Sequence, residues 1–304
     1  MIQNISKAVF LILFISNTLF AQESNIQTYT PSKLLKKGQW DIKFFNSIYT
    51  QTEQTGEGSN SRDIPRESYF TNTNEVYTGV SKNARINIGF IFQIRSNVFG
   101  DANALDVFKF NDDANSRSGL TTIAPSIRVQ PFPSIANLSF TSSLYIAVFE
   151  DKVDAPYLDK RSLFWETKFF YDKTFGANKW QIFTEADLGF NFGENRKDAD
   201  PQTENISERF ANNSVFLPIS AFLSYFPSSK STVFVNAQQA FLIGYDNPNS
   251  SDQNFSQNAT SFGFGGKYQL TNTLNIEVSY GKIARGYSYQ GLGHTYSIGL
   301  RTIL

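Results

Sequence analysis

The sequence contains no cysteine, a single histidine, and one methionine, which is the initiator. Without cysteine there can be no disulfide, no thiolate metal site and no lipid attached through a cysteine at a signal junction. One histidine cannot form a histidine cluster that binds a metal. We therefore expect no metal, no cofactor and no catalytic site of these kinds.

The chain also lacks any bias of charge, because Lys plus Arg and Asp plus Glu both number 27. Nothing in this balance favours nucleic acid or an anionic surface, and we expect no nucleic-acid partner. Mean hydropathy is negative. After residue 22 no apolar run approaches the length of about 20 residues that a membrane-spanning helix requires.

The amino-terminal residues have the pattern of an export signal. Lys7 precedes the apolar run of residues 8–20, and the small Ala21 stands before Gln22. The run is shorter than a spanning helix, so we interpret residues 1–22 as a secretory signal peptide. Residues 23–38 include the basic stretch TPSKLLKKG, and we interpret them as a periplasmic N-terminal lead-in; the alternative is a plug that enters the lumen from below.

From residue 39 to residue 304 one unit repeats, in which about ten residues alternate apolar and polar before a turn. Successive side chains of a strand point to opposite faces, so this alternation predicts strands whose two faces meet different surroundings. The clearest is RINIGFIFQIR, and the weakest is SYFTNTNEVYTGVS, which has Asn or Thr on both faces. In TTIAPSIRVQ, Pro125 removes a donor from the ladder and predicts a bulge.

The connections between these strands alternate in length. Short turns (KNA, PFPSIAN, KTFGAN, FPSSKS and TNT) alternate with long polar segments, and the link near residues 284–290 is shorter. Bacterial outer-membrane barrels have short periplasmic turns, longer outer loops and aromatic girdles, and this chain has 30 Phe and 14 Tyr. The long segments are residues 54–67, 100–118, 150–161, 193–212 and 245–258.

These patterns predict an all-β protein, a transmembrane antiparallel up-and-down β-barrel of about 12 strands over residues 39–304. We expect it in the cell outer membrane of a Gram-negative bacterium. The alternative is a soluble β-sandwich or lipocalin-like barrel. That alternative does not require loops of alternating length, and small soluble barrels use fewer strands.

The face of each strand opposite the apolar one would line the lumen. Its charges either tune the selectivity of a pore or form paired ladders that fill a narrow interior. Its aromatic rings either form a path for small solutes or act as core filler, because twelve strands lie between a filled barrel of eight and an open one of sixteen. The lumen-lining candidates are Lys43, Glu75, Arg85, Arg95, Arg128, Glu166, Lys168, Glu185, Asp187, Lys267, Glu277, Arg301, Phe45, Phe170, Phe183 and Phe222.

The segment KLLKKGQWDIKFFNSIYTQ, with the export signal and the strand pattern, resembles transporter-like outer-membrane barrels of Bacteroidetes. It is also similar to the group named "MetA-pathway of phenol degradation". The resemblance implies a porin-like channel for passive uptake of small apolar or amphipathic solutes. The implied partners are outer-membrane lipid, a small-molecule solute and, during biogenesis, periplasmic chaperones and the barrel-assembly machinery. The final residue, Leu304, is similar to the apolar C-terminal signal of such barrels, which usually ends in Phe.

A second resemblance, to outer-membrane phospholipase A, concerns two short segments. Residues 49–51 (YTQ) and 291–294 (GLGH) match parts of its motifs. Tyr296 stands where that family has a serine, and Ser297 would point to the other face, away from His294. Nucleophile and base must lie within hydrogen-bond reach, so we predict no enzyme. The alternatives are a closed structural or adhesin barrel that acts through loops 100–118 and 193–212, and, less favoured, an acyl hydrolase.

Overall fold

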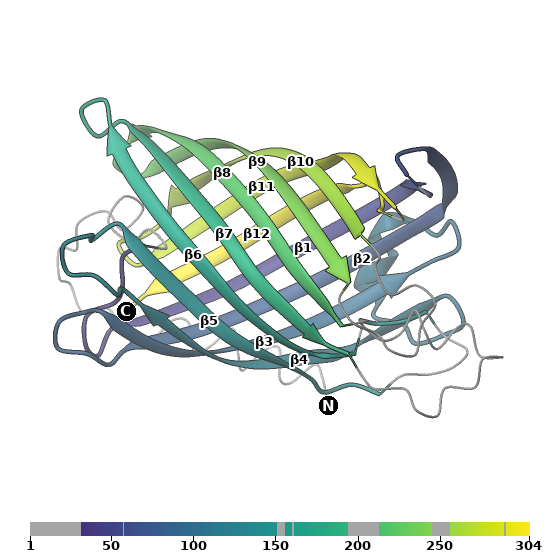
Figure 1. Cartoon of the computed structure of the whole chain (residues 1–304), viewed down its shortest axis with the longest axis horizontal. Coiled ribbons are helices and arrows are strands. Elements are labelled where there is room, and N and C mark those ends of the chain that lie inside the picture. The colour runs from purple at the N-terminus through teal and green to yellow at the C-terminus, as the bar shows by residue number, and fades with distance from the viewer. Residues whose placement is uncertain are drawn as a thin grey trace.

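The computed structural model describes residues 32–304 apart from residues 57, 151–155, 160, 194–212, 245–255 and 289. In this part of the chain twelve antiparallel strands form one closed barrel, in which each strand pairs with its sequence neighbours and the first pairs with the last (Figure 1). The predicted fold class is confirmed. The strands are β1 (Trp40–Thr55), β2 (Ser61–Gly79), β3 (Ile86–Val98), β4 (Ser116–Val129), β5 (Leu138–Ala147), β6 (Leu163–Phe175), β7 (Trp180–Phe192), β8 (Ser214–Ser228), β9 (Ser231–Gly244), β10 (Ser256–Gln269), β11 (Leu274–Tyr287) and β12 (His294–Ile303).

The alternating residues of each strand face either the outside of the barrel or its lumen. Large apolar side chains of the outward face are exposed, among them Val235 at 55% and Phe264 at 59%, whereas polar side chains such as Asn87 and Glu166 are buried. A wall that is apolar outside and polar inside is the arrangement of a barrel surrounded by lipid. Closure also satisfies the backbone polar groups of every strand edge, which hydrocarbon requires. No helix in the described part of the chain is long and apolar enough to cross a membrane.

The barrel closes at the seam between β1 and β12, where ten consecutive residue pairs run from Asp41↔Ile303 to Thr50↔His294. The backbone N–H of Trp40 donates to the carbonyl of Leu304 at 2.9 Å, and the N–H of Leu304 donates to the carbonyl of Trp40 at 2.9 Å. The C-terminus thus lies at the end of the barrel that carries the short turns (left in Figure 1). By the usual arrangement of such barrels this is the periplasmic end.

The hairpin between β1 and β2 corrects one predicted loop. The sequence predicts a polar loop over residues 54–67, but β1 continues to Thr55 and β2 begins at Ser61. Polar residues pair across this extension, as in Glu53↔Asp63 and Gln54↔Arg62, after a register shift near Gln51. Polar strands pair as well as amphipathic ones once they leave the lipid, so the loss of alternation marks the end of the membrane rather than the end of the strand.

The predicted bulge at Pro125 is wrong. The register between β4 and β5 is the same on either side of Pro125, from Ile123↔Ile146 to Ser126↔Ser143. A shift occurs instead between β3 and β4, where Gln93 and Ile94 face Thr122 and Leu120. The fixed φ of proline is compatible with an extended chain, so Pro125 removes one donor from the ladder without displacing the strand.

The predicted weak strand lies within β2, which pairs with β3 over Ser68–Gly79 and with β1 from Ser61 to Thr78 with one register shift. Its outward Asn72 donates from Nδ2 to Oδ1 of Asn46 at 3.0 Å, and Asn74 donates to Asn72. The amide groups satisfy one another on the outer face, which lowers the cost of polar side chains there.

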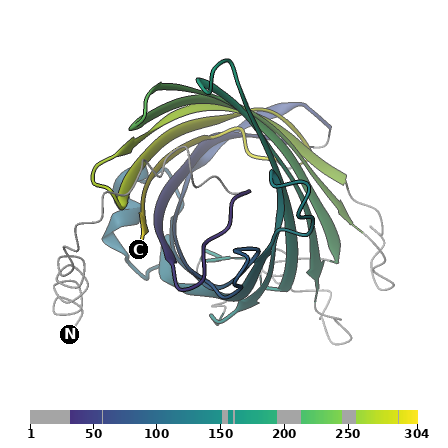
Figure 2. The same ribbon diagram turned by 90° about the vertical axis from the view of Figure 1, so that its left-hand side faces the viewer.

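Residues 32–38 enter the periplasmic end of the lumen, where the purple start of the described chain lies inside the ring of strands (Figure 2). Leu35 is 2% exposed and packs against Tyr77 and Ile303. The sequence allows residues 23–38 to be a periplasmic lead-in or a plug. Residues 32–38 lie inside the lumen, as a plug would. Residues 23–31 and the predicted signal peptide, residues 1–22, lie outside the described residues.

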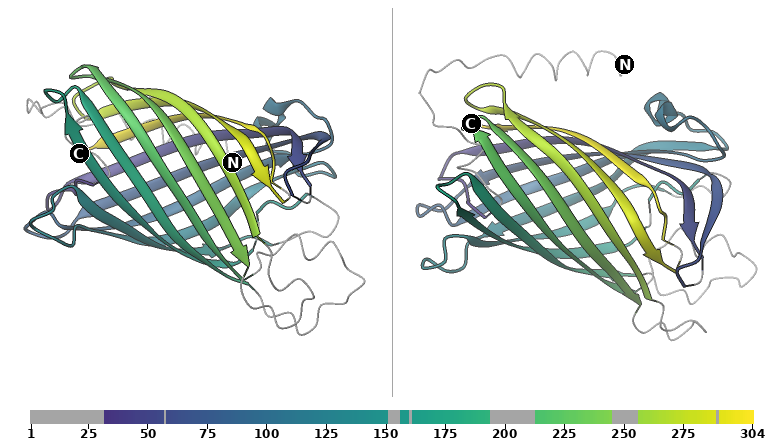
Figure 3. Two further views of the ribbon diagram at one scale, coloured as in Figure 1. Left: turned by 45° about the horizontal axis from the view of Figure 1, so that its top comes forward. Right: turned by 90° about the horizontal axis from the view of Figure 1, so that it is seen from above.

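The connection between β3 and β4, which the sequence predicts only as a long polar loop, contains a short 3-10 helix, η1 (Ala104–Lys109). It lies beside the barrel wall rather than across the opening (Figures 2 and 3). Its fully buried Val107 packs against Phe70 and Val98 on the outward face of β2 and β3.

Candidate functional site in the lumen

A cluster of charges occupies one wall of the lumen near the periplasmic end. Asp41 on β1 is completely buried and accepts hydrogen bonds from two arginines of other strands. Arg301 donates from Nε at 2.8 Å and from Nη2 at 3.1 Å, and Arg128 donates from Nη1 at 3.0 Å. Hydrogen bonds between charged groups are the stronger kind, so this carboxylate ties β1, β4 and β12 together.

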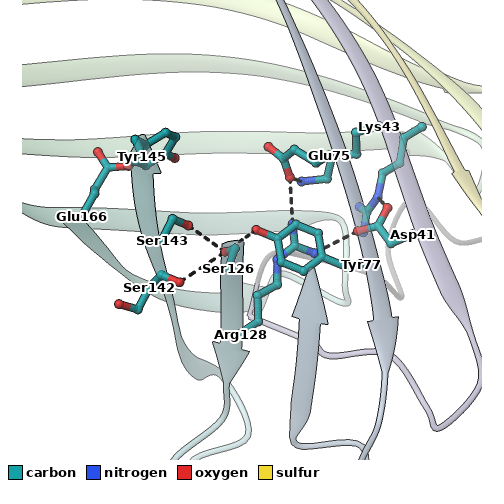
Figure 4. Close-up of polar contacts among 11 residues, drawn as sticks. Asp41, Lys43, Glu75, Tyr77, Ser126, Arg128, Ser142, Ser143, Tyr145 and Glu166 are labelled. Atoms are coloured by element: carbon teal, nitrogen blue, oxygen red, sulfur yellow. Dashed lines mark hydrogen bonds and ion pairs between the residues drawn. The ribbon is translucent and has the colours of Figure 1, made fainter. Parts of the chain in front are cut away.

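The cluster extends through Arg128, which lies between two carboxylates and above an aromatic ring (Figure 4). Its Nη2 donates to Glu75 Oε2 at 2.8 Å, and Lys43 Nζ donates to the same oxygen at 2.9 Å. The guanidinium carbon is 3.3 Å from the ring centroid of Tyr77. Three cations, Lys43, Arg128 and Arg301, thus face two carboxylates, which gives this wall a formal net charge of +1.

The wall formed by β6 and β7 has the opposite balance. Lys168 Nζ lies 3.5 Å from Glu166, 3.5 Å from Glu185 and 3.3 Å from Asp187. One cation among three carboxyl groups gives a formal net charge of −2. Side chains of both walls line one cavity of about 230 Å³, to which Leu35 also contributes. An electric field therefore crosses this part of the lumen.

A row of aromatic rings follows the inner wall from β6 to β9. Consecutive ring centroids lie 5.8, 5.5 and 5.9 Å apart. At the end of the row, Lys267 lies 5.8 Å from the centroid of the last ring, Phe234, and pairs with Glu277 at 2.8 Å. The rings thus form a continuous apolar strip along the lumen wall. The row consists of Phe170, Phe183, Phe222 and Phe234.

Glycines on neighbouring strands let inward rings lie against the wall. A Cβ added to Gly299 would be 2.5 Å from the ring of Phe45, and one added to Gly265 would be 2.5 Å from the ring of Phe234. No other residue leaves room for so close an approach. These rings lie against the wall rather than across the lumen. This arrangement favours rings that line a path for solutes over rings that fill the interior.

A second cavity, of about 420 Å³, lies at the outer end of the lumen. Part of the loop between β5 and β6 enters it, because Asn97 Nδ2 donates to the carbonyls of Tyr157 at 3.0 Å and Leu158 at 2.8 Å. Arg95 pairs with Asp159 at 3.0 Å, and Leu158 is 2% exposed. Residues 156–159 therefore narrow the lumen from the outside.

The structure separates the other candidates from these groups. Arg85 donates from Nε and Nη2 to the backbone carbonyl of Gln130, at 3.0 and 2.6 Å, beside the periplasmic turn between β4 and β5. Asp41, Tyr77 and Tyr157 were not among the predicted candidates. The position of Asp41 on the same strand face as Lys43 is the signal that could have identified it.

The residues that resemble phospholipase motifs do not assemble. The His294 ring nitrogen Nδ1 and the Tyr280 hydroxyl lie 2.8 Å apart. Ser297 lies on the other face of β12 and donates to Ser47 Oγ at 3.1 Å. His294 and Ser297 thus have different partners on opposite faces of one strand.

A closed barrel that is apolar outside and charged inside defines the class, an outer-membrane β-barrel. No protein-family model matches the chain, and no curated protein sequence matches it. Its fold is similar to the crystal structure of an outer-membrane channel from Pseudomonas putida F1, with a TM-score of 0.66, 10% identity, and coverage of 90% of this chain and 98% of that one. It is also similar to the β domain of the Bordetella autotransporter BrkA, with a TM-score of 0.52, 11% identity, and coverage of 87% and 98%. At these identities the likeness shows the fold alone.

Proposed function

We propose that this barrel is a channel through which small amphipathic solutes cross the outer membrane by passive diffusion. The observation that carries the proposal is the pair of lumen cavities, of about 230 and 420 Å³, lined by polar and aromatic side chains. A barrel whose interior serves only as packing would close these spaces, since protein interiors leave few voids larger than a water molecule.

The lining supports amphipathic solutes over wholly apolar ones. An apolar molecule could contact the ring row of β6–β9, but it would also displace water from paired charges, which costs free energy. A molecule with an apolar face and a polar edge satisfies both surfaces. Passage of small apolar compounds, which the resemblance to the "MetA-pathway of phenol degradation" group implies, is the same transport class with a less polar solute.

The two narrow points set the route. Residues 32–38 lie at the periplasmic end and residues 156–159 at the outer end, so a solute passes each in turn. Between them the oppositely charged walls orient a dipolar solute and bias the passage of ions. Transport then follows the concentration gradient and requires no energy source.

The test is conductance of the refolded barrel in planar bilayers, together with swelling of proteoliposomes in solute. We expect discrete conductance steps. Thr141→Trp adds bulk to the cavity of about 230 Å³ near the periplasmic end, the lower cavity, and should reduce the conductance steps. Leu144→Trp, on the outer face of the same strand, should leave them unchanged. Silence at every voltage combined with no swelling would overturn the proposal and favour the closed structural or adhesin barrel. Of the loops assigned to that alternative, loop 100–118 packs η1 against the wall, and residues 194–212 lie outside the described part.

A further inference from the structure

The outer cavity differs in chemistry from the rest of the lumen. Its lining within the described residues contains three tyrosines and several amides and hydroxyls, and Leu158 is its one aliphatic side chain. Arg95 and Asp159 pair across 3.0 Å, so the charged side chains that line the cavity sum to no formal net charge. A solute that enters from outside meets this compartment first. Its chemistry suits an uncharged molecule with many hydroxyl groups.

The aromatic rings come from two strands and the inward loop. The ring of Tyr69 on β2 lies 6.0 Å from that of Tyr49 on β1 and 6.5 Å from that of Tyr157, at interplanar angles of 34° and 39°. Phe99 contacts two of these rings edge-on, with its centroid 5.4 Å from that of Tyr69 and 5.8 Å from that of Tyr157. Tilted rings of this kind present faces against which the C–H surface of a sugar ring can pack.

A hydrogen-bonded chain holds the phenol groups in place. Tyr49 donates to Gln51 Oε1 at 2.6 Å, Gln51 Nε2 donates to Glu67 Oε2 at 2.7 Å, and Tyr69 donates to the same oxygen at 2.8 Å. The phenols of Tyr49 and Tyr69 thus donate their protons to protein acceptors, and the hydroxyl oxygens of Tyr69 and Tyr157 lie 3.3 Å apart. The site is therefore organised before a ligand arrives, which reduces the cost of binding.

Two buried polar atoms at this wall have no partner among the described residues. Asn97, 1% exposed, donates to two loop carbonyls, but its Oδ1 accepts no hydrogen bond there, and Arg95 Nε donates none. Both residues are on β3, two positions apart, and both line the cavity. Buried polar groups are rarely left without partners, so an unpaired acceptor on Asn97 and an unpaired donor on Arg95, both on residues that line the cavity, point to a ligand that carries both.

We propose that the outer cavity binds a neutral carbohydrate of one or two sugar units, as the first binding site along the channel. A volume of about 420 Å³ lies within the range of small-molecule sites. The three tyrosines pack against the sugar ring, and Asn97 and Arg95 bond its hydroxyls. The inference rests on the proposed channel function, because it names the solute of that channel.

The experiment is isothermal titration calorimetry with the refolded chain in a detergent without a sugar headgroup, using maltose and sucrose as probes and phenol and glucuronate for comparison. We expect saturable binding of at least one disaccharide and weaker binding of phenol and glucuronate. Tyr69→Ala should weaken disaccharide binding about fivefold to tenfold, the loss of one stacking contact, and Tyr69→Phe should weaken it less. Tyr145→Ala, in the lower cavity, is the matched control.

Thr71→Trp provides a second variant, because it fills the outer cavity without removing a tyrosine and should abolish binding. Binding of phenol or glucuronate in preference to both disaccharides, or equal losses in Tyr69→Ala and Tyr145→Ala, would overturn the inference. Conductance without sugar binding would leave the channel proposal intact and reject the carbohydrate. Sugar binding by a barrel that never conducts would support the site and reject the channel.

Discussion

Leu35 and Asn87 exchange two hydrogen bonds across the periplasmic end of the lumen. The backbone N–H of Leu35 donates to Asn87 Oδ1 at 3.1 Å, and Asn87 Nδ2 donates to the Leu35 carbonyl at 3.2 Å. The side-chain amide on β3 thus pairs with the incoming segment as a neighbouring strand would. Because the contact is polar and local, it holds the segment in the lumen without making its position irreversible.

The first prediction concerns this contact. Since the chain has no native cysteine, Leu35→Cys with Asn87→Cys creates a single possible disulfide. We expect the oxidised protein to conduct poorly and a reductant to raise single-channel conductance, because reduction frees the segment from the wall. Each single variant serves as a control that reductant should not affect. Equal conductance before and after reduction, with the cross-link verified by mass, would show that the segment does not limit the pore.

The second prediction concerns stability of the charge cluster. Arg128→Gln removes one of the two guanidinium groups on buried Asp41 and one of the two cations on Glu75. Breaking a buried pair leaves charge uncompensated and costs about 3–5 kcal/mol. We expect a lower midpoint of urea unfolding in micelles. Arg85→Gln is the matched control, because its guanidinium donates to a backbone carbonyl, and a comparable loss in that variant would refute the special role of Arg128.

The third prediction concerns ion preference. Lys168 is the cation among the three carboxyl groups of the β6–β7 wall, so Lys168→Gln makes the lumen more negative. The reversal potential in a KCl gradient should shift towards greater cation preference. Lys282→Gln removes an exposed lysine paired in register with His294 on the opposite face from the lumen, and should leave the reversal potential unchanged. Identical shifts in both variants would assign the effect to surface charge.

The fourth prediction concerns the rings that lie over glycine. Gly299→Ala would place a Cβ 2.5 Å from the ring of Phe45, so the ring must turn away from the wall and into the lumen. We expect lower conductance with the barrel still folded. Gly281→Ala is the control, because the nearest atoms to its new Cβ lie 3.8 Å away. If Gly299→Ala conducts as well as Gly281→Ala, Phe45 has room to move without narrowing the pore.

The sequence predicts the strands and their faces because period-two alternation follows directly from two different surroundings. It does not predict the contact of Leu35 with Asn87 or of Asn97 with the loop carbonyls, since both join segments far apart in the chain. The sequence predicts a loop where β1 and β2 form a long hairpin, because these strands become polar on both faces beyond the membrane. For η1 the sequence signal is the cluster of apolar residues in ALDVFK, within an otherwise polar loop.

The fifth prediction concerns η1, whose outer side is apolar. Val107 is buried against the wall, and the ring of Phe108 lies 5.2 Å from that of Phe70, yet Phe108 is 51% exposed and Leu105 is 61% exposed. These side chains lie beside the lipid-facing surface of β2 and β3, so we expect them to contact the outer leaflet, as interfacial helices do.

A fluorophore on Leu105→Cys should therefore be quenched by brominated lipid, whereas one on Lys109→Cys, in the same helix and also 61% exposed at its side chain, should be quenched much less. The comparison isolates the direction of each side chain, because the two positions belong to one short helix. Lys109 pairs with Asp106 at 3.0 Å, and we expect this charged pair to remain in water rather than in lipid. Equal quenching at both positions would contradict the prediction. It would mean that η1 leaves the wall when the protein is in a bilayer, so that Val107 no longer packs against Phe70 and Val98.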